Sequence, residues 1–196
     1  MEVIGKYVFI AEGVRGSLAK KIIANYDLSK NSDYPKFGIG IKEVWEVKSE
    51  KHKEGQVLHT MGWPLGNSTG GGSFLYHGSD NQVYIGFVVH LNYKNPYLFP
   101  YKEFQKFKHH PFICNLLDGG KRIEYGARAI SEGGIQSVPK LSFPGGVLIG
   151  CSAGFVNVPR IKGNHNAIIS GIEAAEAAYF ALNNGCLLYT SPSPRD

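Results

Sequence analysis

Three glycine-rich segments are the parts of this sequence best suited to bind a planar or charged ligand. They are 11–17 (AEGVRGS), 70–77 (GGGSFLYH) and 144–154 (PGGVLIGCSAG). Because glycine has no side chain, a ligand or a second backbone can approach its peptide groups closely. Each segment is therefore considered both as a binding loop and as a tight turn.

The first segment follows an apolar run and precedes a helical pattern. That order is typical of the glycine turns of nucleotide-binding folds. It is also typical of an ordinary helix start in which Ser17 is the N-cap. From the residues alone, both interpretations stay open.

The 144–154 segment contains the strand-like run Gly146–Gly150 and leads, through a polar loop, to a helical pattern over 166–183. The N–H groups that begin such a helix, near 164–167, favour negative charge. In a flavoprotein they would stabilise the reduced, anionic flavin. An ordinary strand–loop–helix connection explains the pattern as well.

In the 70–77 segment, three consecutive glycines open an aromatic strand and leave main-chain groups accessible to a flat ligand. A β-bulge or a hairpin turn is the simpler interpretation.

The sequence contains few features that indicate nucleophilic catalysis or metal binding. His109 and His110 are adjacent and would not converge on one ion, and no HExxH, GxSxG or P-loop motif occurs. The three cysteines, Cys114, Cys151 and Cys186, form no CxxC motif, and their odd number argues against a disulfide framework. We therefore predict no catalytic residue and no metal site, and a reducing compartment.

Composition limits the class of protein. The 196 residues are 43% hydrophobic and include 25 glycines, which fits one domain or two intertwined ones with a real core. The net charge of +5 is spread along the chain, so we expect no nucleic-acid partner. The longest apolar run, 83–91, is far too short to span a bilayer, and no targeting signal is visible. Aromatic and lysine residues alternate over 93–108, which suits a membrane interface or a core-facing helix with a solvated lysine face.

Hydrophobic periodicity predicts a mixed α/β (α+β) chain. Strands are expected at 6–10, 37–48, 56–61, 72–76, 83–91 and 146–150, and helices at 18–26, 101–108 (bounded by Pro100 and Pro111) and 166–183. In the 37–48 strand, Phe37, Ile39 and Ile41 share one face, and the pattern shifts register at Glu43. The apolar side of the last helix is predicted to consist of Ile168, Ile169, Ile172, Ala175 and Tyr179.

Four strings taken together resemble one family over nearly all of residues 1–185. They are HTMGWPL, GGSFLYH, GFVVHLNYKNPYLFPYKEFQKFKHHP, and the stretch from GGKRIEYGARAISEGG to IKGNHNAI. The family is electron transfer flavoprotein-ubiquinone oxidoreductase. The resemblance implies a monotopic membrane flavoprotein with FAD, a [4Fe–4S] cluster and a quinone pocket, which passes electrons from reduced electron transfer flavoprotein to ubiquinone.

The resemblance also implies a domain layout. Residues 1–34 and 138–185 would belong to an FAD-binding, Rossmann-like domain, and 35–137 to an inserted, largely antiparallel quinone-binding sheet domain. Gly71 and Gly72 would line the quinone head. The flavin contacts implied by the resemblance are Glu12, Gly13, Arg15, Gly16, Gly150, Gly154, Gly163, Asn164, Asn166 and Ala167.

The sequence departs from the family pattern at several places. The GxGxxG that opens the FAD domain is absent, and three cysteines do not supply the four thiolates of a cluster. Gly70 stands where a tyrosine is usual, and Asn164 and Asn166 where threonines are common. We therefore expect an internal fragment that is inactive and binds FAD weakly on its own, followed by a non-native tail at 186–196.

Ubiquinone, electron transfer flavoprotein and a membrane surface are the implied partners, at the mitochondrial inner or the bacterial cytoplasmic membrane. Two related flavoproteins remain as alternatives: a geranylgeranyl-reductase-like and a nitrogen-fixation-associated FAD-dependent oxidoreductase. A non-enzymatic membrane-surface module, motivated by the aromatic and lysine segment, is a third.

Overall fold

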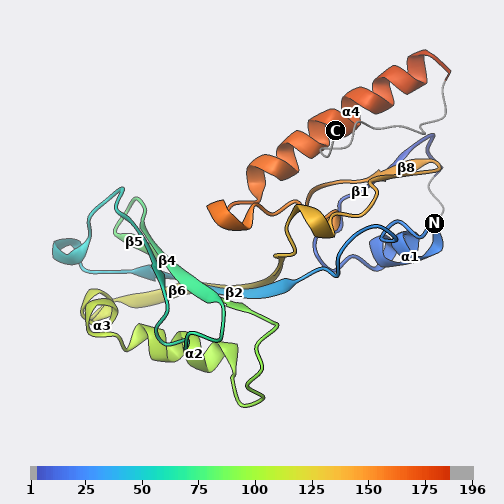
Figure 1. Ribbon diagram of the computed structural model, residues 1–196. Helices are drawn as coiled ribbons and strands as arrows, with labels where there is room; N and C mark the ends of the chain where they lie inside the picture. Colours follow the sequence, from blue (N-terminus) through green and yellow to red (C-terminus); the bar gives the residue numbers. More distant parts are fainter. Residues whose placement is uncertain (1–3, 186–196) are drawn as a thin grey trace. The chain divides into compact units, whose positions relative to one another are not determined.

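The computed structural model describes residues 4–185 and contains two compact units (Figure 1). One unit consists of residues 4–36 and 130–185, and we call it the two-segment unit. The other, residues 37–129, is the sheet unit. The predicted non-native tail at 186–196 lies outside the described residues.

The sheet unit is built on a five-stranded sheet in the order β3-β4-β5-β2-β6. Its strands are β2 (Phe37–Glu46), β3 (Val57–Met61), β4 (Gly71–His77), β5 (Gln82–His90) and β6 (Lys121–Ser131), and the last two residues of β6 belong to the two-segment unit. The pairs β2–β5, β3–β4 and β4–β5 are antiparallel. Four of these strands confirm the sequence prediction. β6 is absent from the sequence prediction, although Ile123, Tyr125, Ala127 and Ala129 alternate with polar residues or glycine; most of its positions are exposed.

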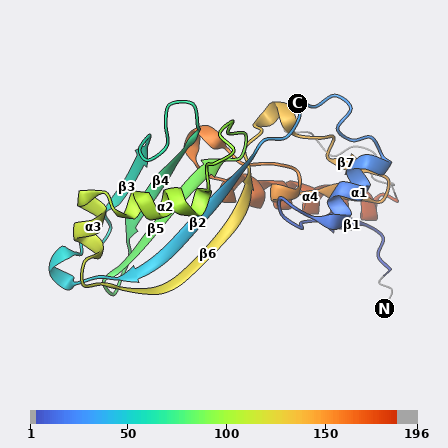
Figure 2. The ribbon, with the colours of Figure 1, turned by 90° about the horizontal axis from the view of Figure 1, so that it is seen from below.

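Helices α2 (Pro100–Lys108) and α3 (Pro111–Leu117) cover one face of this sheet (Figure 2). Phe87 of β5 stacks on Phe104 and Phe107 of α2, with ring centroids 6.3 and 5.4 Å apart. The core-facing interpretation of the aromatic and lysine segment is therefore confirmed for both α2 phenylalanines. Because they are buried, they cannot be membrane contacts as the surface-module alternative requires.

Pro111 does not merely end the preceding helix, as predicted, but occupies the first turn of α3. Its fixed φ and missing N–H suit that position. His110 is the N-cap, and its Nδ1 accepts a hydrogen bond from the N–H of Phe112 at 3.3 Å. The adjacent histidines thus mark the junction of two helices.

The two-segment unit contains a small sheet in the order β1-β8-β7. Strand β1 (Val8–Ile10) is parallel to β8 (Gly146–Leu148), which forms a hairpin with β7 (Ser142–Phe143). Helices α1 (Ser17–Asn25) and α4 (Asn164–Asn183) lie on opposite sides of this sheet in Figures 1 and 2. Single 3-10 turns occur at Ile135–Ser137, Gly150–Ser152 and Val158–Arg160, and in the sheet unit at Ser49–Lys51.

The predicted apolar side of α4 is wrong. Ile168, Ile172 and Tyr179 are exposed, and so are Ile169 and Ala175, whereas the buried positions are Ala174, Ala178 and Ala181. Small alanine side chains allow a helix to approach its neighbours closely, and the larger isoleucines masked this weaker stripe in the sequence pattern. The helix also begins two residues earlier than predicted, at Asn164.

Candidate functional site

The 11–17 turn is organised around the carboxylate of Glu12. Glu12 Oε2 accepts a 2.7 Å hydrogen bond from the N–H of Ala19 in the first turn of α1. The N-cap is Gly16, without a side-chain cap, and Ser17 is already helical, so the predicted Ser17 cap is wrong. A Cβ on Gly16 would collide with the Glu12 side chain, which explains this glycine by close packing. Arg15 is exposed.

The first glycine turn and the Gly150–Gly154 loop lie together. Ser152 Oγ donates to the Gly13 carbonyl at 3.3 Å. Gly150, at φ +57°, donates its N–H to Ser170 Oγ on α4 at 2.9 Å. The fold thus connects β1, β8 and α4 through main-chain groups that the sequence singled out.

A cavity of about 810 Å³ lies within the two-segment unit. That volume is in the range of roughly 300–1,000 Å³ typical of cofactor and ligand sites. Its wall is mainly apolar and includes Val138, Leu141, Val147 and Leu148, with polar groups at Asn157, Asn166 and Ser170.

Only part of the predicted flavin set faces this cavity. Gly154 and Asn166 line it, whereas Gly150, Gly163, Asn164, Ala167 and the four residues of the first turn are not among its wall residues. No side chain caps the N-terminus of α4, which begins next to that wall. The apolar wall and the polarised helix start fit a flat ring that accumulates negative charge.

Glu132 is a wall residue that the sequence did not reveal. Burial raises the pKa of Glu132 to about 7, because its charged form loses hydration. Glu173 of α4 also lines the cavity. Neither residue belongs to a recognisable sequence motif, so their position in the cavity wall could not be predicted from the sequence.

In the sheet unit, the predicted quinone glycines are packed against the chain itself. A Cβ on Gly71, which has φ +153°, would collide with the Val88 carbonyl and Leu65. A Cβ on Gly72 would approach the Thr60 carbonyl oxygen to 2.6 Å. Strand crowding therefore accounts for both glycines, in line with the simpler interpretation of this segment, although their main-chain groups are half-buried rather than fully covered.

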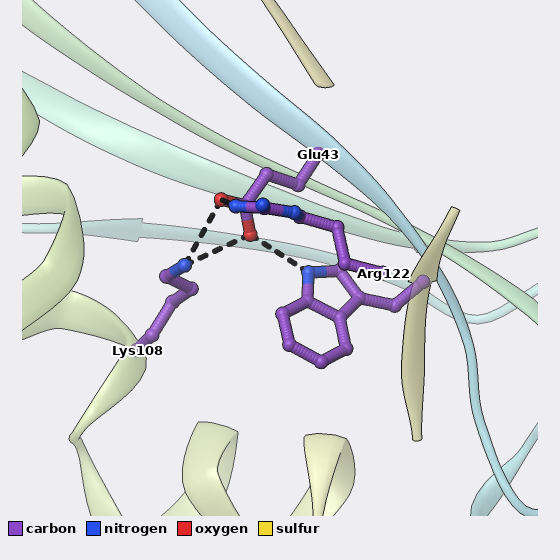
Figure 3. Close-up of polar contacts among 4 residues, drawn as sticks. Glu43, Lys108 and Arg122 are labelled. Atoms are coloured by element: carbon purple, nitrogen blue, oxygen red, sulfur yellow. Dashed lines mark hydrogen bonds and ion pairs between the residues drawn. The ribbon is translucent and has the colours of Figure 1, made fainter. Parts of the chain in front are cut away.

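A cluster of charged side chains in the sheet unit centres on Glu43 (Figure 3). It was not identified from the sequence. Glu43 is 2% exposed, and its carboxylate binds Lys108 at 2.9 and 3.0 Å and Arg122 at 3.2 Å. The indole N–H of Trp45 donates to the same carboxylate at 2.8 Å. The hydrogen bond that Arg122 donates to Glu43, and the negative charge of Glu43, raise the pKa of Arg122.

The predicted register shift at Glu43 is wrong. The pairing of β2 with β5 runs without interruption from Gly38 to Glu46, so Glu43 stays on the same face as Ile39 and Ile41. A carboxylate can occupy this core-facing position because two cations and an N–H satisfy it.

The described residues contain neither a metal-binding cluster nor a helix that could span a membrane. Among residues 4–185, no group of three His, Cys, Asp or Glu side chains could bind a metal ion together. Over the same residues, each helix is too short or too polar to cross a bilayer.

Comparison with known proteins identifies relatives of the whole described chain. Residues 37–130 match the family described as ETF-QO, ubiquinone-binding. The chain is 54% identical over 192 residues to the mitochondrial electron transfer flavoprotein-ubiquinone oxidoreductase of Arabidopsis thaliana, covering 97% of this chain and 30% of that protein. It is 51% identical to the Pseudomonas aeruginosa oxidoreductase of the same name, covering 94% and 34%.

Solved structures share the fold at low sequence identity. A geranylgeranyl bacteriochlorophyll reductase-like protein from Thermoplasma acidophilum superposes with a TM-score of 0.69 at 17% identity, covering 97% of this chain and 43% of that one. A flavoprotein/dehydrogenase from Cytophaga hutchinsonii gives 0.55 at 15% identity, covering 93% and 42%. The chain therefore shares its mixed α/β fold with these two proteins.

The chain spans about a third of the length of the curated relatives that it matches. Within that span the identity is high and nearly continuous. The resemblance predicted from the sequence is thus confirmed: residues 37–130 match the ETF-QO ubiquinone-binding family, and nearly the whole chain is similar to a part of electron transfer flavoprotein-ubiquinone oxidoreductases.

Proposed function

We propose that this chain is part of an enzyme that transfers electrons from reduced electron transfer flavoprotein, through FAD, to ubiquinone. The observation that carries this proposal is the 54% identity over 97% of the chain, together with the ubiquinone-binding family match over 37–130. The geranylgeranyl-reductase-like alternative is not favoured, because 17% identity supports a shared fold and no more.

We assign the quinone domain to residues 35–137 and the FAD domain to residues 1–34 and 138–185. The sheet unit would hold the quinone at Gly71 and Gly72. The two-segment unit would hold the flavin through the ten residues that the family resemblance implies. Support comes from the cavity, whose wall includes Gly154 and Asn166, and from the contact between the first turn and the Gly150–Gly154 loop.

FAD, when bound, would supply the electron-accepting and electron-donating ring. The chain's own residues would hold that ring and set its charge preference. The N–H groups at the start of α4 would favour the reduced anion, and the apolar wall around Val147 and Leu148 would exclude water. Peptide groups at Gly71 and Gly72 would bond the quinone oxygens.

The residues present do not fit the [4Fe–4S] cluster of the full-length family. Such a cluster takes four cysteine thiolates, and the sequence holds three cysteines, with Cys114 and Cys151 on different units. We therefore assign no step of the reaction to a cluster in this chain.

We further propose electron transfer flavoprotein and a membrane surface as partners, at the mitochondrial inner or bacterial cytoplasmic membrane. The mitochondrial and bacterial relatives support the first partner by name.

Binding of ubiquinone-1 to the chain tests the proposal. Both tryptophans, Trp45 and Trp63, lie in the sheet unit, so quinone quenching of their fluorescence reports on that unit. We expect saturable quenching by ubiquinone-1. The control is an equal concentration of 3-methylbut-2-en-1-ol, the alcohol of its isoprenoid side chain, which should not quench. Quenching that stays linear with quinone concentration would be collisional and would contradict the proposal.

A further inference from the structure

The sheet of the sheet unit has two faces of very different character. Val83, Ile85, Phe87 and Val89 of β5 are at most 1% exposed and belong to the core that α2 and α3 cover. Because side chains alternate along a strand, Tyr84, Gly86, Val88 and His90 are on the opposite face. We call this the outer face.

Glycines flank Val88 on the outer face. In the strand register, Val88 lies between Gly40 of β2 and Gly72 of β4. We call these three residues the outer floor. Cross-strand neighbours of this kind normally carry side chains that pack together, so a glycine on both sides leaves an unusually flat surface.

The outer floor is bounded along the strands by two rings. On one side, the next row contains Gly86, and a Cβ there would collide with the ring of Phe74, which therefore lies across β5. On the other side lies His90. Its imidazole occupies the space that a Cβ on Gly70 would take, and its main-chain N–H donates to the Gly70 carbonyl at 3.0 Å. Gly86 and His90 are about 13 Å apart along the strand.

Gly40 is the glycine of this floor that the fold does not require. Its φ is not positive, and the nearest atoms to an added Cβ, the Arg128 carbonyl oxygen and Val88 Cγ2, would both be at an ordinary 3.7 Å. A glycine inside a strand weakens it and commonly marks the close approach of a ligand or another backbone. Gly72, in contrast, is required by the nearby Thr60 carbonyl.

We propose that the ubiquinone head lies flat on Gly40, Val88 and Gly72, between the Phe74 ring and His90, with the His90 imidazole hydrogen-bonded to one quinone carbonyl. The inference rests on the proposed quinone function and extends it to residues on β2 and β5. A quinone head is planar, its carbonyl oxygens accept hydrogen bonds, and an imidazole N–H is a suitable donor. The aromatic Phe74 suits the apolar edge of the ring.

Substitutions at Gly40 test the floor. Gly40→Leu should fold, because the site has room and leucine suits a strand better than glycine, but it would lift the ring from the floor. We expect the dissociation constant of ubiquinone-1 to rise by about 30-fold or more in Gly40→Leu and by about fivefold in Gly40→Ala. Gly171→Leu, an equally open position on α4, is the matched control and should bind as the wild type does.

Substitutions at His90 test the hydrogen bond. His90→Leu removes the donor and should weaken ubiquinone-1 binding by about tenfold, and His90→Gln, which keeps an N–H donor, should recover most of that loss. We expect the two variants to have the same thermal unfolding midpoint but different affinities for ubiquinone-1. A purely structural role of His90 would not produce that difference.

The outcomes of these experiments distinguish failure of the outer-floor site from failure of the proposed quinone function. Saturable wild-type binding that neither Gly40→Leu nor His90→Leu weakens would overturn the outer-floor site and leave the proposed quinone function standing. No saturable binding by the wild type would overturn both. Weakened binding in Gly40→Leu with wild-type behaviour of Gly171→Leu is the result that supports the site.

Discussion

The two units of this chain are stabilised in different ways. The sheet unit has an interior of twelve buried residues, centred on stacked aromatic rings, and it buries a carboxylate with its cations. The two-segment unit has two smaller buried clusters, a large cavity, and a 20-residue helix that exposes several isoleucines and aromatic residues. Its loops are fixed mainly by hydrogen bonds to main-chain groups.

The two units therefore offer different places for a ligand to bind. In the sheet unit, a dense core covers one face, and the opposite face carries the outer floor, where glycines stand on both sides of Val88. In the two-segment unit, the glycine loops and the cavity are themselves the candidate site. The predictions below test this contrast, beginning with the largest effect.

Truncating a large apolar side chain to alanine should affect the two units very unequally. Phe87→Ala should lower the free energy of unfolding by about 3–5 kcal/mol, because it leaves a cavity among Phe104, Phe107 and their neighbours. Ile172→Ala on exposed α4 should cost less than about 1 kcal/mol. Urea unfolding measures both, and equal losses would contradict the contrast between the two interiors.

Two lysines on α2 distinguish the fully buried Glu43 cluster from an ion pair whose lysine is exposed. Lys108→Met leaves the Glu43 carboxylate with only Arg122 and Trp45, and should cost about 3 kcal/mol. Lys106→Met removes a 2.8 Å pair in which the lysine is exposed and Glu103 is buried, and it should cost less than Lys108→Met because Lys106 itself gives up little hydration in the fold. Similar costs in urea unfolding would show that Glu43 does not depend on Lys108.

The start of α1 provides a smaller effect in the two-segment unit. Glu12→Ala removes the acceptor for the Ala19 N–H and should destabilise the unit by about 1 kcal/mol. Ser17→Ala should change stability little, since Ser17 makes no cap bond. A larger loss from Ser17→Ala, measured by thermal unfolding, would restore the Ser17 cap that the sequence suggested.

The smallest expected effect is a pH dependence in the sheet unit. Burial, then the charges of His52 and Lys53, lower the pKa of His77, whose Nδ1 accepts from the Lys53 N–H at 3.0 Å. The unfolded chain therefore binds a proton below about pH 6.5 that the folded chain resists.

Stability should be full above that pH and should fall as the pH drops below it, by at most about 1.4 kcal/mol per pH unit from this group. His77→Gln should flatten the acid side of the stability curve, with His59→Gln, whose ring is more exposed on β3, as control. An unchanged slope in His77→Gln would show that His77 does not carry the effect.

The sequence predicted most strands and helices because their apolar patterns are strong. It failed where a polar residue has partners far along the chain: Glu43 looked like a break in β2, and only the fold brings Lys108 and Arg122 to it. It also failed on α4, where isoleucines suggested the buried side but alanines occupy it. β6 was overlooked although Ile123, Tyr125, Ala127 and Ala129 alternate with polar residues or glycine, a period-2 signal that is weakened by the two small alanines.

The candidate site was predictable in part. Glycine-rich segments can be recognised directly in a sequence, and the three such segments of this chain supply most of the residues in the proposed flavin and quinone sites. What a sequence does not show is which atoms crowd each glycine. Gly71 and Gly72 are crowded by carbonyl groups of neighbouring strands, while a Cβ on Gly40, which no sequence motif marks, would make only ordinary contacts at 3.7 Å.

The most direct test of the account is to map where ubiquinone-1 binds, by ¹H–¹⁵N NMR on the glycine-labelled chain. The account predicts chemical-shift changes at Gly40, Gly72 and Gly86 that saturate together, with Gly126 and Gly171 unchanged. Changes confined to glycines of the two-segment unit, such as Gly150 and Gly154, would contradict the assignment of the quinone to the sheet unit.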